Sequence, residues 1–224
     1  MPSKNTIRKF VEGGIYHIYN RGVEKRDIFL DEQDYRIFLY YLKTYLTPPN
    51  NKKKTPLNIS RLGINFDLYK NINLLCYVLM PNHFHFLVKQ ISKDAVTELM
   101  KRLTNAYVKY FNDKYQRVGP LFQGRYRGVL VLKDEYFMYL SFYIHINPIE
   151  LPEYSDIKKL KNYSYSSYMD YISKRNTSWV HKDYILNYIR KDKFTTYKKF
   201  TEELILESDK YNKYKKDLKP VLLD

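Results

Sequence analysis

Two apolar segments separated by only two residues constrain the fold of this chain more than any other feature. The run "INLLCYVLM" occupies residues 72–80, and "HFHFLVKQ" follows at 83–90, after a Pro-Asn pair. Each run is too short and too continuously apolar for a surface helix, and a two-residue connection suits a turn between antiparallel strands. The sequence therefore predicts a central hairpin, with strands over 72–80 and 83–90.

The segments on either side of this hairpin predict the rest of the sheet and its helices. Residues 31–46 and 93–115 carry apolar side chains at helical spacing, and Asp31 suits an N-cap. The remaining predicted elements are a strand over 14–20, a strand over 125–133, and a third helix over 135–147 that is capped by Asp134 and ends before Pro148.

This order, β-α-β-β-α-β followed by α, predicts an α+β fold with a ferredoxin-like βαββαβ antiparallel sheet. Two helices would cover one face, and the third helix could lie across the other face, where a site would be located. We expect residues 1–150 to form this main domain. Residues 151–224 would form a helical, basic C-terminal extension, with helical segments at 162–172 and 182–208.

The charge of the chain points to a polyanionic partner. The formal net charge is +15, and the window 101–133 holds eight Lys or Arg residues but only one acid, Asp113. A surface this basic most often binds nucleic acid. The candidate DNA contacts are Arg125 and Arg127, which strand alternation would place on one face, together with Arg21, Lys101 and Arg102. A solvated, charged strand face is the alternative, and Lys52, Lys53 and Lys54 are expected in a solvated loop.

No apolar run reaches membrane-spanning length, and the first ten residues lack the apolar core of a signal peptide. We therefore expect a soluble, cytoplasmic protein. The single cysteine, Cys76, lies within an apolar run and is expected to be a buried thiol.

Two histidines lie two residues apart in the second strand of the hairpin. Residues i and i+2 of a strand point to the same face, so His83 and His85 project together while Phe84 and Phe86 face the helices. Two imidazoles at this spacing can share a metal ion. Two unrelated strand histidines are the alternative.

The third helix could complete such a site. Tyr143 and Asn147 are four residues apart and stack on one helical face, which Tyr139 continues, whereas His145 points elsewhere. The amide oxygen of Asn147 could be a third metal ligand, with the phenol of Tyr143 beside the metal. Taken alone, Tyr143 could equally be a packing residue and Asn147 a turn former.

Four segments in order resemble one family. "YHIYNRG", "CYVLMPNHFHFLVK", "LFQGRYRG" and "YIHINP" resemble the motifs of single-tyrosine HUH transposases, insertion-sequence transposase-like proteins, and most closely the branch of REP-associated tyrosine transposases. "YSYSSY" at 163–168 also resembles a stretch of that branch. The likeness covers residues 10 to 170.

The resemblance implies an activity and its residues. It implies a metal-dependent single-stranded DNA endonuclease and strand transferase that acts on hairpin-containing DNA through a 5′-phosphotyrosine. Tyr143 would be the nucleophile, with Tyr139 as the second choice. His83, His85 and Asn147 would bind Mg²⁺ or Mn²⁺.

The resemblance also implies that the partner is single-stranded DNA with a hairpin formed by a palindromic repeat. A monomer is favoured, and a homodimer that exchanges the third helix remains open. Two other functions are compatible with the sequence. One is a non-catalytic protein that binds structured nucleic acid on the same fold. The other is a replication or plasmid-mobilisation nickase, although those commonly have a longer histidine cluster.

Overall fold

The computed structural model of the chain describes residues 10–48, 68–132, 134–191 and 196–206. In this part of the chain, four strands form one antiparallel sheet in the order β2-β3-β1-β4. The strands are β1 (Ile15–Arg21), β2 (Ile72–Met80), β3 (His83–Gln90) and β4 (Arg127–Leu130). The helices are α1 (Glu32–Leu46), α2 (Leu68–Asn71), α3 (Ala95–Lys114), α4 (Asp134–Ile146), α5 (Ile157–Leu160), α6 (Tyr168–Tyr171), α7 (Asp183–Lys191) and α8 (Tyr197–Leu206).

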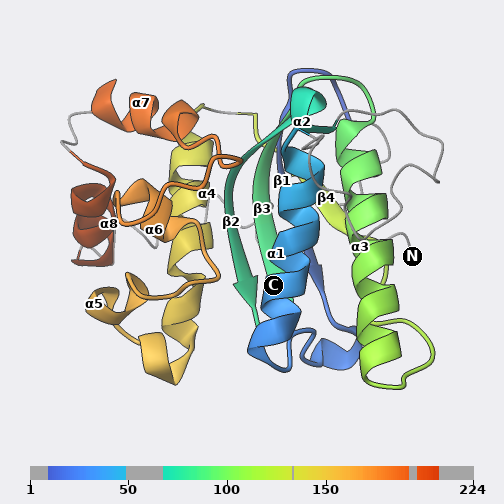
Figure 1. Ribbon diagram of the computed structural model, residues 1–224. Coiled ribbons are helices and arrows are strands. Elements are labelled where there is room, and N and C mark those ends of the chain that lie inside the picture. The colour runs from blue at the N-terminus through green and yellow to red at the C-terminus, as the bar shows by residue number, and fades with distance from the viewer. Residues whose placement is uncertain (1–9, 49–67, 133, 192–195, 207–224) are drawn as a thin grey trace.

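The sheet separates two layers of helices (Figure 1). Helices α1 and α3 cover one face, and α4 lies across the other, with the C-terminal helices outside it. The predicted ferredoxin-like order followed by a third helix is therefore confirmed. No helix in the described residues is long and apolar enough to cross a membrane.

The first layer forms because the apolar faces of α1 and α3 meet alternate residues of the central strands. Phe38 of α1 is fully buried and packs against Phe84 and Phe86 of β3, with ring centroids 5.4 Å and 6.2 Å away. Helix α1 begins at the predicted N-cap, because the Asp31 carboxylate accepts a hydrogen bond from the Asp34 amide in a capping box. Because Phe84 and Phe86 face these helices, the residues that alternate with them in β3 point to the opposite face of the sheet.

The strands of the hairpin match their predicted limits, but β4 does not. It spans only Arg127–Leu130, so the prediction of a strand over 125–133 is wrong at both ends. The physical reason is the pairing partner: β1 pairs with β4 only from Tyr16 to Tyr19, and it offers no partner to Arg125. The cations at 52–54, predicted to lie in a loop, fall outside the described residues.

The C-terminal extension covers the outer edge of the sheet. Ser166 forms an antiparallel bridge with Val78, and Val180 forms a parallel bridge with Leu74, so chain from the extension lies beside β2. The prediction of a helix over 162–172 is wrong for most of its length, because only Tyr168–Tyr171 is helical. The backbone amide of Tyr77 donates to the Ser167 hydroxyl, and the amide of Ser167 donates to the Tyr77 carbonyl. These bonds hold the segment against β2, in turns and a single bridge instead of a helix.

Helices α7 and α8 pack on α4 through aromatic contacts. The ring of Phe137 lies 4.9 Å from that of Tyr188, and the rings of Tyr139 and Phe142 lie within 6.0 Å of Phe200. The sheet covers one side of α4 and the extension covers the other, which fixes the helix over the sheet. The division of the chain at residue 150 stays a prediction.

Candidate metal and nucleophile site

The histidine face of the sheet is formed by β3 and β1 together. His83 lies opposite Arg21 in the register and His85 lies opposite Tyr19, so these four side chains leave the sheet on the side that α4 covers (Figure 1). The imidazoles of His83 and His85 lie 5.0 Å apart and nearly perpendicular. The prediction that they project together is confirmed.

The protonation of His83 is fixed by its neighbour Asn82. The Asn82 side-chain amide donates to the Lys25 carbonyl at 3.2 Å, so its oxygen faces Nδ1 of His83 at 2.6 Å. That oxygen can only accept, and Nδ1 therefore carries the proton. Burial lowers the pKa of His83 to about 4, although the nearby side chain of Asn147 acts in the opposite direction, so the ring is neutral near pH 7 and Nε2 presents a lone pair.

A hydrogen bond to the last turn of α4 fixes the orientation of the Asn147 side chain. Asn147 follows the last residue of the helix, and its side-chain nitrogen donates to the Tyr143 carbonyl at 2.8 Å. This bond satisfies a carbonyl in the last turn of the helix. It also turns the amide oxygen of Asn147 toward Nε2 of His83, at 3.3 Å.

Two acceptors therefore face each other in a buried position. Neither Nε2 of His83 nor Oδ1 of Asn147 has a proton to offer, and their separation of 3.3 Å is close to that of two neighbouring ligands on a metal ion with bonds of about 2.1 Å. A divalent cation between them would turn an unfavourable contact into two coordinate bonds. The side chains present thus fit a metal ion.

His85 supplies a third buried acceptor atom, its Nε2. Its ring is fully buried, and Nε2 has no hydrogen-bond partner among the described residues, which costs about 1–3 kcal/mol for a buried polar atom. Nδ1 lies 2.8 Å from Nε2 of His17. When Nδ1 donates to His17, Nε2 is left as an acceptor, an arrangement typical of histidines that bind metals through one nitrogen. Burial lowers the pKa of His85 well below its usual value, and the nearby His17, His83 and Arg21 act in the same direction.

The three candidate ligands are two histidines and one amide. In the part of the chain that the structure describes, no group of three or more His, Cys, Asp or Glu side chains could hold a metal ion. A site here would therefore depend on the amide oxygen of Asn147 as well as on the imidazoles. A mixed set of two nitrogens and one oxygen suits Mn²⁺ and is compatible with Mg²⁺.

Tyr143 lies beside these ligands, one helical turn before Asn147. Its ring centroid is 5.6 Å from His85 and 6.4 Å from His17, and both contacts are edge-on. Tyr139, the second choice for the nucleophile, is buried against Phe200 of α8. His145 points away from the other two histidines, as predicted, and is hydrogen-bonded to Tyr197 and Ser167 of the extension.

The same face holds two more buried polar atoms that have no hydrogen-bond partner in the described part of the chain. These are the hydroxyl of Tyr19 and Nε of Arg21. The charge of Arg21 also lowers the pKa of His83, although burial is the larger cause. An anionic ligand placed over the histidines would satisfy both atoms.

The five predicted DNA contacts do not form one group. Arg21 and Arg127 belong to the histidine face, since Arg127 pairs with Tyr19 in the register. Lys101 and Arg125 instead line a cleft beside α3. Arg102 forms an ion pair with Glu98, with a nitrogen–oxygen distance of 3.5 Å. The expectation that alternation places Arg125 beside Arg127 is not met, because the strand begins only at Arg127.

Three residues of this face had no role in the sequence reasoning. His17, Tyr19 and Asn82 contact or orient the candidate ligands. The alternation of His17, Tyr19 and Arg21 in "YHIYNR" is visible in the sequence and places them on one side of a strand. Their position next to His85 depends on the pairing of β1 with β3, which the sequence leaves open.

Comparisons with known proteins found a family model that matches part of the chain and a solved structure with a similar fold. Residues 58–147 match the family model described as "Transposase IS200 like", a range that includes both histidines, Tyr143 and Asn147. Among solved structures, a REP-associated tyrosine transposase bound to a REP hairpin has a similar fold. Its TM-score is 0.52 at 13% sequence identity, and the match covers 80% of this chain and 98% of that chain. None of the curated proteins compared with the chain matches it.

Replacing the amide ligand should remove metal binding. We expect the Asn147→Leu variant to bind Mn²⁺ at least ~10-fold more weakly than the unchanged protein, because the oxygen opposite His83 is lost. Titration calorimetry with Mn²⁺ measures this. Asn105→Leu, on the exposed surface of α3, is the matched control and should bind as before. Equal affinity in both variants would exclude Asn147 as a ligand.

The buried histidines should make the metal-free protein sensitive to acid. Burial lowers the pKa of His83 to about 4 and that of His145 to about 3, below the value of about 6.5 in an unfolded chain. Below pH 6.5 the unfolded state therefore binds protons that the folded state does not. Urea unfolding should show that the free energy of unfolding falls by about 2 kcal/mol per histidine between pH 7 and pH 5. An unchanged free energy over this interval would contradict the neutral, buried state of these rings.

Proposed function

We propose that this chain, whose residues 58–147 match the IS200-like transposases, is a metal-dependent single-stranded DNA endonuclease and strand transferase. The observation that carries the proposal is the pair of opposed acceptors on His83 and Asn147, with Tyr143 one turn away on the same helix. The substrate would be DNA that contains a hairpin. This is supported by the similarity in fold to a transposase bound to a REP hairpin.

His83, His85 and Asn147 would hold a divalent ion, Mg²⁺ or Mn²⁺. When bound, such an ion supplies positive charge for a non-bridging oxygen of the scissile phosphate and offsets the charge that develops in the transition state. Asn82 and His17 would act on the ligands themselves. By accepting from Nδ1 of the two histidines, they keep Nε2 of each ring available for the ion.

Tyr143 would be the nucleophile. Its phenol oxygen forms a bond to phosphorus as the bond to the 3′ oxygen breaks, which leaves a 5′-phosphotyrosine and a free 3′-hydroxyl. The phenol proton passes to solvent, and the departing 3′ oxygen takes one up. The partly buried ring, held edge-on against His85 and His17, fixes the direction of attack.

The covalent link conserves the energy of the phosphodiester. A second 3′-hydroxyl can attack the phosphotyrosine and join the DNA to a new strand, so no nucleotide is needed. In agreement with this, the sequence contains no GxxxxGK[ST] phosphate-binding loop.

Arg21 and Arg127 would hold the substrate backbone over the site. They lie on either side of Tyr19 on the histidine face, and Nε of Arg21 has no partner within the described residues. Phosphate contacts of this kind position the strand without reading its sequence. The packing of α4 between its own sheet and the extension favours a monomer that uses its own Tyr143.

Substitution of the nucleophile tests the proposal. After incubation with Mn²⁺ and a labelled single-stranded hairpin DNA, the unchanged protein should give a covalent adduct on a denaturing gel. Tyr143→Phe should abolish it, because the attacking oxygen is removed. The matched control is Tyr139→Phe, which makes the same change at a ring buried against Phe200 and should keep the adduct within about twofold.

Two results would contradict the proposal. An adduct that still forms in Tyr143→Phe would show that another residue is the nucleophile. No adduct with the unchanged protein, under conditions in which DNA binding is measured directly, would favour a non-catalytic nucleic-acid-binding protein on the same fold.

A further inference from the structure

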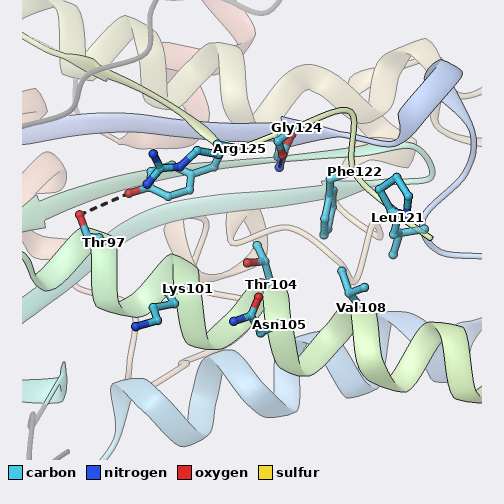
Figure 2. Close-up of a pocket in the computed structure, with 12 residues that line it drawn as sticks. Thr97, Lys101, Thr104, Asn105, Val108, Leu121, Phe122, Gly124 and Arg125 are labelled. Carbon is cyan, nitrogen blue, oxygen red and sulfur yellow. Dashed lines mark hydrogen bonds between the residues drawn. The ribbon is translucent and has the colours of Figure 1, made fainter. Parts of the chain in front are cut away.

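A cleft lies on the other side of the sheet from the histidines, at the edge formed by β4. It has a volume of about 400 Å³ and separates α3 from the segment 120–126. Figure 2 shows Lys101, Thr104, Asn105 and Val108 on the helix side, and Leu121, Phe122, Gly124 and Arg125 on the opposite side. The volume falls in the range of small-ligand sites.

The cleft combines an apolar floor with a polar, cationic rim. Phe122 is 7% exposed and Val108 is half-buried, whereas Lys101, Asn105 and Arg125 are exposed. None of the described residues that line the cleft is acidic. Within the described residues, Lys101 and Arg125 form no ion pair, in contrast to Arg102, which Glu98 neutralises. The cleft therefore suits a ligand with an aromatic part and a negative charge.

Hydrogen bonds hold the wall of the cleft in place. Asn20 is buried at the end of β1, where its side-chain nitrogen donates to the Gly124 carbonyl at 3.1 Å. The backbone amide of Gln123 donates to the Arg21 carbonyl at 3.0 Å, and Gly22 forms a bridge with Phe122. At one end, the Tyr126 hydroxyl lies 3.5 Å from the Thr97 hydroxyl, as the dashed line in Figure 2 marks. A wall fixed in this way loses little freedom when a ligand binds.

The cleft and the histidine face meet at the end of β1. Asn20 lines the cleft, and the next residue, Arg21, lies beside His83 on the opposite face. The same relation holds near β4, where Arg125 lines the cleft and Arg127 belongs to the histidine face. Because β4 is an edge strand, the cleft and the histidine face adjoin at this edge of the sheet.

We propose that this cleft binds one unpaired nucleotide of the single-stranded DNA that extends from the hairpin. The base lies against Phe122 and Val108, Asn105 offers hydrogen bonds to its edge, and Lys101 and Arg125 hold the flanking phosphates. This inference rests on the proposed function for the identity of the strand. It adds a second contact that holds the strand beyond the site of cleavage.

The test compares a fluorescein-labelled hairpin carrying a single-stranded thymidine tail with the same hairpin without a tail. For the unchanged protein the tail should increase affinity in fluorescence anisotropy titrations. In the double variant Lys101→Gln/Arg125→Gln, affinity for the tailed DNA should fall roughly tenfold, and the slope of log affinity against log salt should fall by about 1.4. Affinity for the tail-less hairpin should not change.

Two further variants distinguish DNA binding in the cleft from a general effect of positive charge on DNA affinity. Lys109→Gln removes an exposed cation from the same helix outside the cleft and should leave tail binding as in the unchanged protein. Asn105→Trp keeps the charge but fills the cleft, and it should remove the gain in affinity from the tail. An equal loss of affinity for both DNAs in the double variant, or an unchanged gain from the tail in Asn105→Trp, would overturn the proposal.

Failure of this site and failure of the chemistry give different results. Tyr143→Phe should bind the tailed DNA as tightly as the unchanged protein while forming no adduct. If the unchanged protein forms no adduct but the cleft variants still lose affinity for the tail, DNA binding in the cleft is supported and the proposed nuclease activity is wrong. If the adduct forms and the cleft variants bind the tailed DNA normally, the nuclease activity is supported and the proposed binding of DNA in the cleft is wrong.

Discussion

The opposed lone pairs of His83 and Asn147 are the constraint on which the candidate site depends. Each acceptor is oriented by a side-chain amide that donates to a backbone carbonyl, and a carbonyl can only accept. Asn82 donates to the Lys25 carbonyl, and Asn147 donates to the Tyr143 carbonyl. The two atoms therefore face each other at 3.3 Å with no proton between them. A buried contact of this kind is unfavourable unless a cation or a ligand joins it, and such contacts are concentrated at functional sites.

This contact exists only because α4 is held in one position over the sheet. The extension contributes directly, through a buried chain of hydrogen bonds that runs from His145 of α4 to Tyr197 of α8 and to Ser167 at the edge of β2. Its hydroxyl and imidazole groups are satisfied within the protein, and His145 lies between Tyr143 and Asn147 along the chain. Toward the extension, both ring nitrogens of His145 are bonded, whereas toward the histidines the oxygen of Asn147 faces another acceptor.

Much of this arrangement could be predicted from the sequence where periodicity is strong. The hairpin at 72–90 and the alternation of His83 with Phe84 follow from strand geometry alone, and the one-turn spacing of Tyr143 and Asn147 follows from the helix. The pairing of His17 with His85 could not be predicted, because it depends on the register between distant strands. The role of Asn82 depends on which of its side-chain atoms faces Lys25. The segment 163–167 does not form the predicted helix, because it bonds to Tyr77 through Ser167, a contact 90 residues away in the chain.

The central claim is that two imidazoles of this face hold the metal ion. Pulsed electron paramagnetic resonance of the protein loaded with one equivalent of Mn²⁺ tests it most directly, because echo modulation reports nitrogen nuclei coordinated to the ion. We expect modulation from two histidine nitrogens, reduced to one when His85 is replaced by alanine. Modulation without any histidine nitrogen, in a protein that binds Mn²⁺ stoichiometrically, would place the ion elsewhere and contradict the account.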